Sequence, residues 1–212
     1  FKNQPMKMAA AEALWNTENP ASFSLFSIPD QSERRDSISI RVPYLTTFLI
    51  YFKPTGEVLG INDLQTQYET QYGPGYYIPN VATAYFAFRV MFYAGFLMLG
   101  VMALVFLLVI WLKKDPLKIR WLKYLPLGIL IPYLANTGGW LLTETGRQPW
   151  VVFGLLRTEN AYSPSVSTGE VLTSLIAFLV IYSILIVVDV ALLVKYAKAG
   201  PQASFNPVEI ED

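Results

Sequence analysis

The chain has 212 residues, 53% of them hydrophobic, and its formal net charge is zero. The apolar content is too high for an ordinary soluble domain and indicates a membrane protein with some polar extramembrane mass. Nothing in the charge points to nucleic acid. The absence of cysteine and histidine excludes disulfides, thiolate catalysis and the commonest metal ligand. Any metal held by this chain alone must therefore use Met, Glu, Asp, Tyr or backbone ligands.

Residues 1–81 are polar and irregular, with frequent aromatic residues, prolines and mixed charge. This composition indicates an ordered extramembrane loop region with short helices rather than a flexible linker. The stretch AAAEALW at 9–15 predicts one such helix. The stretch VPYLTTFLIYF at 42–52 is too short to span a bilayer, so we expect it to be buried or interfacial. The chain starts at Phe1 without an initiator methionine or a signal-peptide pattern, so we expect a fragment or one half of a larger subunit.

Three segments are long and apolar enough to cross a bilayer core, which takes about 20 residues. They lie at 82–112, 121–145 and 171–195. The sequence therefore predicts an all-α membrane protein of three transmembrane helices plus an extracytoplasmic loop domain. We expect it to form part of a larger multi-span helical bundle.

The short loop at 113–120 is rich in Lys and Arg, so the positive-inside rule places it in the cytoplasm. The loop region 1–81 and the loop 146–170 then lie outside. The tail 196–212 returns to the cytoplasm. The protein would thus be multi-pass, in contact with membrane lipid.

Charged side chains within membrane spans are costly and usually face a bundle interior or a cofactor. Arg89 lies one to two turns inside the first span, where it either snorkels to the outer headgroups or supplies a fixed positive charge beside a buried anion. Met91 lies about 200° further round the helix, so the two side chains point to different faces. Methionine here is ordinarily packing, although a thioether can ligate low-spin haem. Asp189 in the third span is interpreted as an ion-pair residue, with a proton path as the alternative.

Trp140, Glu144 and Arg147 follow i, i+4, i+7 spacing at the end of the second span, so they share one face if the helix continues that far. The simplest interpretation is an aromatic anchor and a helix-end ion pair at the membrane surface. The glycine pair at 138–139 would let a neighbouring backbone or a flat ligand approach closely. The topology places Glu144 at a depth similar to that of Met91.

Three separated motifs resemble those of one known family. GWLLTETGRQPW at 139–150 resembles the signature of subunit I of the cytochrome bd quinol oxidases. FAFRVM at 86–91 resembles the segment that carries this family's methionine haem ligand, and QPMKMAAAEALW at 4–15 resembles the start of its quinol-binding loop. The motifs occur in the family's order, and the resemblance covers roughly residues 1–200.

This resemblance implies haem roles for five residues. Met91 would be an axial ligand of the low-spin haem b iron, and Arg89 would stabilise that haem electrostatically. Glu144 would ligate a high-spin haem iron, for which we expect haem b. Trp140 and Arg147 would line the same haem region.

The resemblance also implies that Lys7 and Glu12 bind or oxidise quinol. Their spacing of five is compatible with nearby faces of one short helix. Without the family, such a pair would be a solvated surface pair that contributes little. The loop between Glu12 and Met91 is compact and resembles the short-loop branch of the family.

The implied activity is that of a terminal oxidase of aerobic respiration in the bacterial plasma membrane. It would oxidise membrane quinol and reduce O2 to water through haem b and haem d, generating a proton gradient. Its partners would be the N-terminal half of subunit I, subunit II and a small single-span subunit, and no nucleic acid.

One departure from the family matters. The family's other axial haem ligands are histidines in its N-terminal half, and this chain has none, so we expect it to complete no haem site alone. Two other hypotheses stay open. One is a haem-free membrane scaffold or transporter subunit, in which Arg89, Glu144 and Asp189 are structural or substrate-pairing charges. The other is a non-catalytic half-subunit that supports assembly.

Overall fold

The computed structural model describes residues 3–200, except for the side chain of Leu117, and the chain divides into two units at 1–161 and 162–212. The predicted helical membrane architecture is confirmed. Among the described residues, three helices are long and apolar enough to cross a membrane, and they span Val81–Trp111, Arg120–Gly146 and Thr168–Ala199. Residues 201–212 of the expected cytoplasmic tail lie outside the described part.

The loop region begins with helix α1 (Pro5–Ala11), whose residues Met6, Ala9, Ala10 and Ala11 are buried. Proline suits the first turn of a helix because its missing N–H needs no partner there. The helix expected over AAAEALW is therefore displaced toward the N-terminus. It ends early because Ala13 adopts a φ of +48°, which a helix cannot continue.

An antiparallel hairpin follows, made of β1 (Phe23–Asp30) and β2 (Arg35–Val42). This hairpin was not predicted from the sequence. Helices α2 (Leu45–Tyr51) and α3 (Ile61–Tyr72) complete the region. The apolar stretch expected to be buried or interfacial forms α2, which buries Thr46 and Thr47 and leaves most of its apolar side chains exposed.

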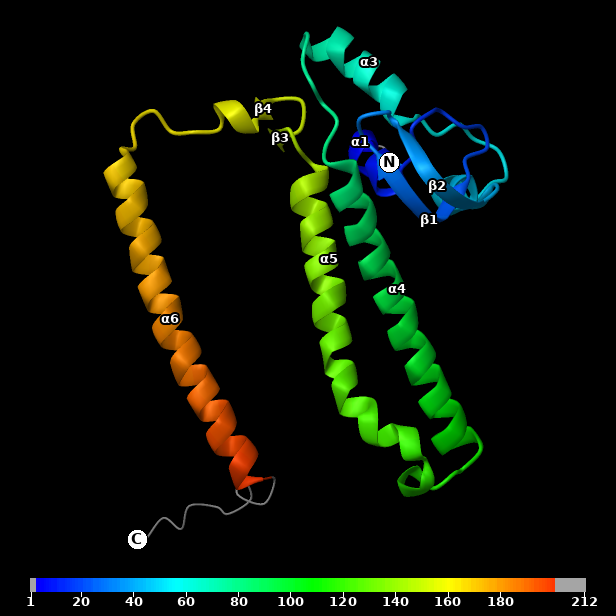
Figure 1. Cartoon of the computed structure of the whole chain (residues 1–212), viewed down its shortest axis with the longest axis vertical. Helices are drawn as coiled ribbons and strands as arrows, with labels where there is room; N and C mark the ends of the chain where they lie inside the picture. Colours follow the sequence, from blue (N-terminus) through cyan, green and yellow to red (C-terminus); the bar gives the residue numbers. More distant parts are fainter. Residues whose placement is uncertain (1–2, 201–212) are drawn as a thin grey trace. The chain divides into compact units, whose positions relative to one another are not determined.

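Two long helices leave the loop region and run side by side (Figure 1). Helix α4 (Val81–Val105) starts where the Asn80 side chain accepts a hydrogen bond from the Thr83 amide, and a wider helical turn extends it to Trp111. Helix α5 (Leu130–Gly146) is preceded by a tighter helical stretch, Arg120–Ile129, that contains Pro126. The two helices are antiparallel, so the start of α4 and the end of α5 meet the loop region together.

The glycine pair of α5 allows close contact with α4. A Cβ placed on Gly138 would lie 2.7 Å from the carbonyl oxygen of Ala87 and 3.2 Å from the backbone nitrogen of Met91. Only glycine permits a backbone approach this close. Of the two uses proposed for the pair, the structure therefore assigns Gly138 to helix packing.

The chain after α5 turns back into the loop region through the short hairpin β3 (Trp150–Val152) and β4 (Leu156–Arg157). Trp150 is buried and stacks on Tyr77, with ring centroids 5.7 Å apart. Stacked aromatic rings of this kind add to the energy of burial. They fasten the end of α5 to the loop region.

The second unit holds one long helix, α6 (Thr168–Ala199), which starts with a capping box between Ser167 and Glu170. Its side chains are exposed and predominantly apolar. Such a helix is stable only against lipid or other helices. Asp189 lies within it, and its role stays a prediction.

Candidate functional site

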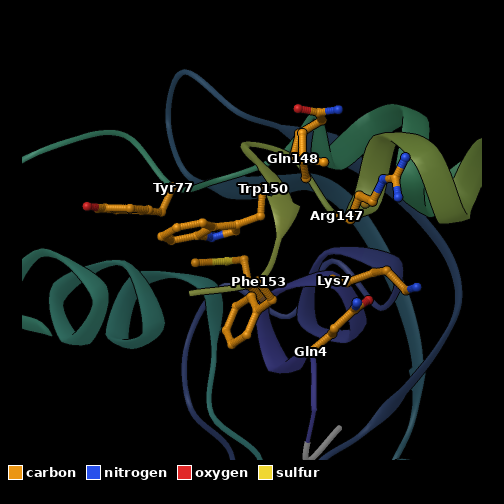
Figure 2. A pocket seen from close by; sticks show the side chains of 10 residues that line it. Gln4, Lys7, Tyr77, Arg147, Gln148, Trp150 and Phe153 are labelled. Carbon is orange, nitrogen blue, oxygen red and sulfur yellow. The ribbon is translucent and has the colours of Figure 1, made fainter. Parts of the chain in front are cut away.

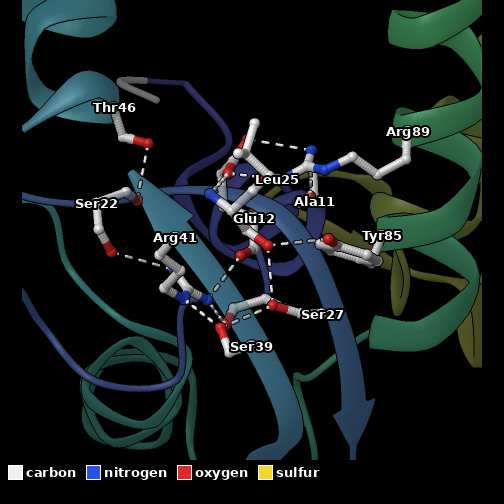
Figure 3. Close-up of polar contacts among 12 residues, drawn as sticks. Ala11, Glu12, Ser22, Leu25, Ser27, Ser39, Arg41, Thr46, Tyr85 and Arg89 are labelled. Carbon is white, nitrogen blue, oxygen red and sulfur yellow. Dashed lines mark hydrogen bonds and ion pairs between the residues drawn. The ribbon is translucent and has the colours of Figure 1, made fainter. Parts of the chain in front are cut away.

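The most deeply buried charged side chains among the described residues are Glu12, just after α1, and Arg89 of α4. Nη2 of Arg89 lies 2.9 Å from Oε2 of Glu12, and each side chain is only 5% exposed. Arg89 also donates to the carbonyl oxygens of Ala11 and Ser24 (Figure 3). Snorkelling is thus the wrong interpretation of Arg89, because its charge faces a buried carboxylate instead of the headgroups.

Aromatic rings enclose the guanidinium of Arg89. Its Cζ lies 4.5 Å from the ring centroid of Tyr85, 4.9 Å from that of Phe23 and 5.1 Å from that of Phe88. Cation–π attraction is strongest where water is excluded. The charge of Arg89 is therefore held in place by α1, β1 and α4 together.

Burial raises the pKa of the Glu12 carboxyl above its ordinary value, and the nearby Arg89 charge offsets only part of this effect. The Ser24 amide also donates to the carboxylate, at 3.2 Å. Arg41 donates to the carbonyl oxygens of Glu12 and Ala13, which fixes the backbone at this point. Glu12 is thus a positioned carboxyl whose proton affinity is increased.

A groove of about 810 Å³ opens beside Glu12. Its walls come from α1, β1, α2 and α4. The side chains that line it are mostly apolar and include Met8, Phe23, Leu49, Ile50, Phe88 and Phe92. A wide apolar groove with one buried carboxyl can bind an apolar molecule that carries an ionisable hydroxyl.

Lys7 does not line this groove. It lies beside Gly146 and lines a separate cavity of about 80 Å³ with Arg147, Gln148 and Trp150 (Figure 2). Lys7 and Glu12 therefore do not share a site, because the two side chains line different cavities, and five helical residues separate them by about 140°.

The small cavity contains unpaired donors. Nε of Arg147 and Nε1 of Trp150 are buried and find no hydrogen-bond partner among the described residues. Buried donors without partners are rare in native proteins. Two residues that line the small cavity therefore carry donors for which the described chain supplies no acceptor.

Met91 and Trp140 share an open groove of about 620 Å³ between α4 and α5. The Sδ atom of Met91 lies 3.1 Å from where a Cβ on Gly139 would be. This glycine therefore leaves the thioether room on the α5 side. Arg89 and Met91 point to different faces of α4, as the helix periodicity predicted, because Arg89 faces β1 and Met91 faces α5.

Glu144 and Arg147 form a hydrogen-bonded ion pair at the end of α5, with both side chains 38% exposed. Trp140, one turn earlier on α5, is 62% exposed. Glu144 lies five residues beyond Gly139, a helix rise of about 7.5 Å, so it lies further along α5 than the turn that meets Met91. Met91 and Trp140 line the same groove, and the similar depth expected for Glu144 and Met91 stays a prediction.

The chemistry of Met91, Glu144 and Arg147 can be compared with what a haem requires. A thioether, a carboxylate and an arginine with an unpaired Nε are groups that ligate haem iron or pair with haem propionates. The open groove exposes Met91 and Trp140 together. Within residues 3–200, no cluster of three or more acidic, His or Cys side chains could bind a metal ion. Met91, Glu144 and Arg147 are chemically compatible with a haem, and a further ligand would have to come from outside residues 3–200.

Sequence reasoning missed three contributors to these sites. Arg41 fixes the backbone of Glu12, and Phe88 and Phe92 form the α4 wall of the large groove. The i, i+4 spacing of the two phenylalanines was a signal for a shared face. The part played by Arg41 left no local pattern, because its partners lie 28 and 29 residues away.

Comparison with known proteins identifies one family. The family model for cytochrome bd terminal oxidase subunit I matches residues 1–201. Cytochrome bd ubiquinol oxidase subunit 1 of Bacillus subtilis (strain 168) is 41% identical over 206 residues, which cover 95% of this chain and 43% of the relative.

A second relative is more distant. Cytochrome bd-II ubiquinol oxidase subunit 1 of Escherichia coli (strain K12) is 27% identical over 258 aligned positions, which cover 94% of this chain and 50% of the relative. The alignment is longer than this chain, so the relative contains inserted segments that this chain lacks. The chain spans half or less of the length of both relatives.

Proposed function

Since the chain belongs to the cytochrome bd terminal oxidase subunit I family, we propose that it is part of a respiratory quinol oxidase of the bacterial plasma membrane. The assembled enzyme would oxidise membrane quinol, reduce O2 to water and generate a proton gradient. The N-terminal half of subunit I and subunit II, with a small single-span subunit, would complete it.

The observation that carries this proposal is the buried carboxyl of Glu12 at the wall of the 810 Å³ apolar groove. A quinol is an apolar ring whose hydroxyl protons must be removed on oxidation. A carboxyl with a raised pKa is a suitable general base for this step, because an effective base titrates near the working pH. Arg89 would stabilise the carboxylate that is ready to accept the proton.

Lys7 would take a different part in quinol binding. Its cavity of about 80 Å³ is too small for a quinol ring. Lys7 would therefore supply a polar contact to one end of a bound molecule, apart from the proton transfer at Glu12.

Met91 would hold the iron of the low-spin haem b together with a histidine from the N-terminal half, and Arg89 would contribute a fixed positive charge. Glu144 would ligate a high-spin haem b, with Trp140 and Arg147 lining that region. Haem d would complete the set of redox centres. Bound haems supply electron transfer and O2 chemistry, while these side chains set ligation, charge and access.

The quinol role is tested by Glu12→Gln in the assembled oxidase, with Glu33→Gln at the exposed hairpin turn as the matched control. We expect quinol oxidation to fall about 100-fold in Glu12→Gln, the range for loss of a general base, with the haem absorption spectrum retained. Glu33→Gln should keep native activity. Native activity in Glu12→Gln would overturn the role of this carboxyl.

The haem role is tested by Met91→Leu, with Met102→Leu on the exposed side of the same helix as the control. We expect the low-spin haem band in the reduced-minus-oxidised spectrum to be lost in Met91→Leu and unchanged in Met102→Leu. An unchanged band in both variants would make Met91 a packing residue.

A haem-free scaffold or transporter is the second candidate function. It is favoured by one observation, that Glu12 and Arg89 form a buried ion pair within this chain, as structural charges do. The absence of haem bands from the purified native complex, with or without dithionite, would favour it over the oxidase.

A further inference from the structure

Strand β1 buries polar side chains and exposes apolar ones. The serines of β1 are buried, with Ser24 Oγ 2.8 Å from Ser27 Oγ, and Ser27 Oγ lies 3.0 Å from Oγ of the exposed Ser39 on β2 (Figure 3). Ser24 also bonds to the hydroxyl of Tyr85 on α4. The outward face is apolar and exposed. An ordinary hairpin on a soluble domain has the opposite arrangement.

The outward side chains form one contiguous surface. Phe26 pairs with Ile40 across the strands, and Ile28 pairs with Ile38. These four residues are 40–57% exposed, and we call them the hairpin patch. Buried hydroxyls beneath exposed large apolar side chains are an informative inversion, since a contiguous apolar patch marks an interaction surface.

Helix α2, next in the chain, repeats the inversion. It buries Thr46 and Thr47, and it exposes Phe48 and Leu49. Phe52, just after the helix, is 80% exposed. Two successive elements therefore turn apolar side chains away from the packed core.

The helix lengths indicate what covers the hairpin patch. The apolar helix that begins at Val81 continues to Trp111 and is followed by the basic Lys113 and Lys114. A hydrocarbon core of about 30 Å takes about 20 helical residues. About 20 residues before Lys113, the outer boundary of the hydrocarbon core therefore falls near Tyr93. The hydroxyl of Tyr93 donates to the carbonyl oxygen of Leu25, so this end of β1 lies at that boundary.

The other end of the hairpin lies further out. The side chain of Gln31, in the turn, accepts a hydrogen bond from the Val81 amide at the first residue of α4. Val81 and Tyr93 are separated by a helix rise of about 18 Å, and strand residues 25–31 cover about 20 Å. The hairpin thus runs along α4, with Phe26 and Ile40 at the deep end and the charged turn at the outer end.

The hairpin and α5 occupy different sides of α4. The hairpin contacts Tyr85, Arg89 and Tyr93, which follow i, i+4, i+8 spacing. Gly138 of α5 contacts α4 at Ala87 and Met91, about 180° away round the helix. A protein segment that covers the groove at Met91 would therefore approach another face of α4 and leave the hairpin patch open.

We propose that the hairpin patch is a lipid-contacting surface, which lies in the boundary between headgroups and acyl chains of the outer leaflet. The deep pair, Phe26 and Ile40, sits at the edge of the hydrocarbon. The shallower pair, Ile28 and Ile38, sits about 7 Å further out among the headgroups. The surface would hold the loop region against the bilayer, beside the groove that leads to Glu12.

The test uses spin labels in the assembled oxidase in lipid nanodiscs. This chain has no cysteine, so Ile40→Cys, Ile38→Cys and Ser32→Cys can each be labelled once the cysteines of other chains are replaced. Collision rates are measured with O2, which concentrates in lipid, and with a water-soluble nickel chelate. We expect the ratio of O2 to nickel accessibility to be highest at 40, intermediate at 38 and lowest at 32.

Two results would overturn the proposal. Nickel accessibility at 38 and 40 equal to that at 32 would place the patch in water. Protection of 38 and 40 from both reagents would show that another protein segment covers it. If a variant fails to assemble, the native oxidase is labelled with a photoactivated apolar carbene reagent dissolved in the bilayer. Peptides of β1 and β2 must then carry the label, and unlabelled peptides would refute the proposal.

Discussion

The protein has two Glu–Arg pairs near its proposed redox sites, and they differ in almost every respect. Glu12 and Arg89 are 77 residues apart in the chain and each side chain is 5% exposed. Glu144 and Arg147 are three residues apart at one helix end and each is 38% exposed. The first pair holds the end of α1, strand β1 and helix α4 together, whereas the second lies at the end of helix α5 alone.

The difference shows which site this chain completes by itself. Breaking a buried pair leaves an uncompensated charge and costs about 3–5 kcal/mol. A pair that is more than a third exposed contributes about 0–1 kcal/mol after screening by water. The charge of Glu12 is therefore compensated within its own chain, while the Glu144 carboxylate stays accessible to a ligand or to a protein segment from outside the described residues.

Removal of the buried cation should have the largest effect. Arg89→Met leaves the Glu12 carboxyl without its partner, and we expect the local opening free energy of the loop region to fall by about 3–5 kcal/mol. Hydrogen exchange of the α1 and β1 amides in the assembled oxidase measures it. The double variant Glu12→Leu/Arg89→Met should recover most of this loss without recovering quinol oxidation. Native exchange rates in Arg89→Met would show that the pair does not hold the region together.

The neighbouring glycines of α5 separate helix packing from the proposed haem ligation. In Gly138→Ala the new methyl meets the backbone of α4, which cannot yield, and we expect a loss of about 1–3 kcal/mol in stability. In Gly139→Ala it meets the flexible end of Met91, so we expect a smaller loss and a shifted low-spin haem band. Thermal unfolding followed by the haem spectrum measures both.

Gly100→Ala is the matched control for this pair, because a Cβ there contacts nothing within 4 Å. It should be neutral or slightly stabilising, since alanine is the better helix former. If Gly139→Ala destabilises as much as Gly138→Ala, or leaves the band unmoved, Met91 does not act as proposed.

The three spans follow from segment length and hydropathy, and the close helix approach at Gly138 was one of two uses that the small residues of the glycine pair allowed. The Glu12–Arg89 pair did not follow, because periodicity carries no information about partners 77 residues apart. Its residues were singled out, but each was assigned a separate role.

The β1–β2 hairpin escaped detection for another physical reason. Serine and isoleucine alternate in β2 as a strand requires, yet in β1 the buried residues are Ser24 and Ser27, and Phe26 and Ile28 are exposed. Alternation is ordinarily interpreted with the apolar face inward. Which face turns inward depends on the hydroxyl of Tyr85 and on the surroundings of the outward face, and neither is encoded in the strands themselves.

The pH dependence of quinol oxidation should report Glu12. Its raised pKa means that the folded protein keeps this proton to a pH above about 4.5, the ordinary value of the carboxyl. Stability from this group is full below the unfolded pKa and is lost as the pH rises through the folded pKa. The ionised form accepts the quinol proton, so kcat/KM should rise with pH through the folded pKa. Glu12→Gln should remove this acid limb, and a limb that persists would assign the proton transfer to another group.

The smallest effect on stability, and the most local one, is expected at the exposed pair. Glu144→Gln removes a carboxylate that is 38% exposed, so the unfolding free energy should change by less than about 1 kcal/mol. If Glu144 ligates a high-spin haem, the same variant should still lose or shift the high-spin bands while the low-spin band is unaltered. Glu159→Gln, in the neighbouring Glu159–Arg157 pair, is the control and should leave all bands unchanged. A Glu144→Gln enzyme with native high-spin bands would reduce this pair to a surface ion pair, and the contrast with Glu12–Arg89 would then be one of burial alone.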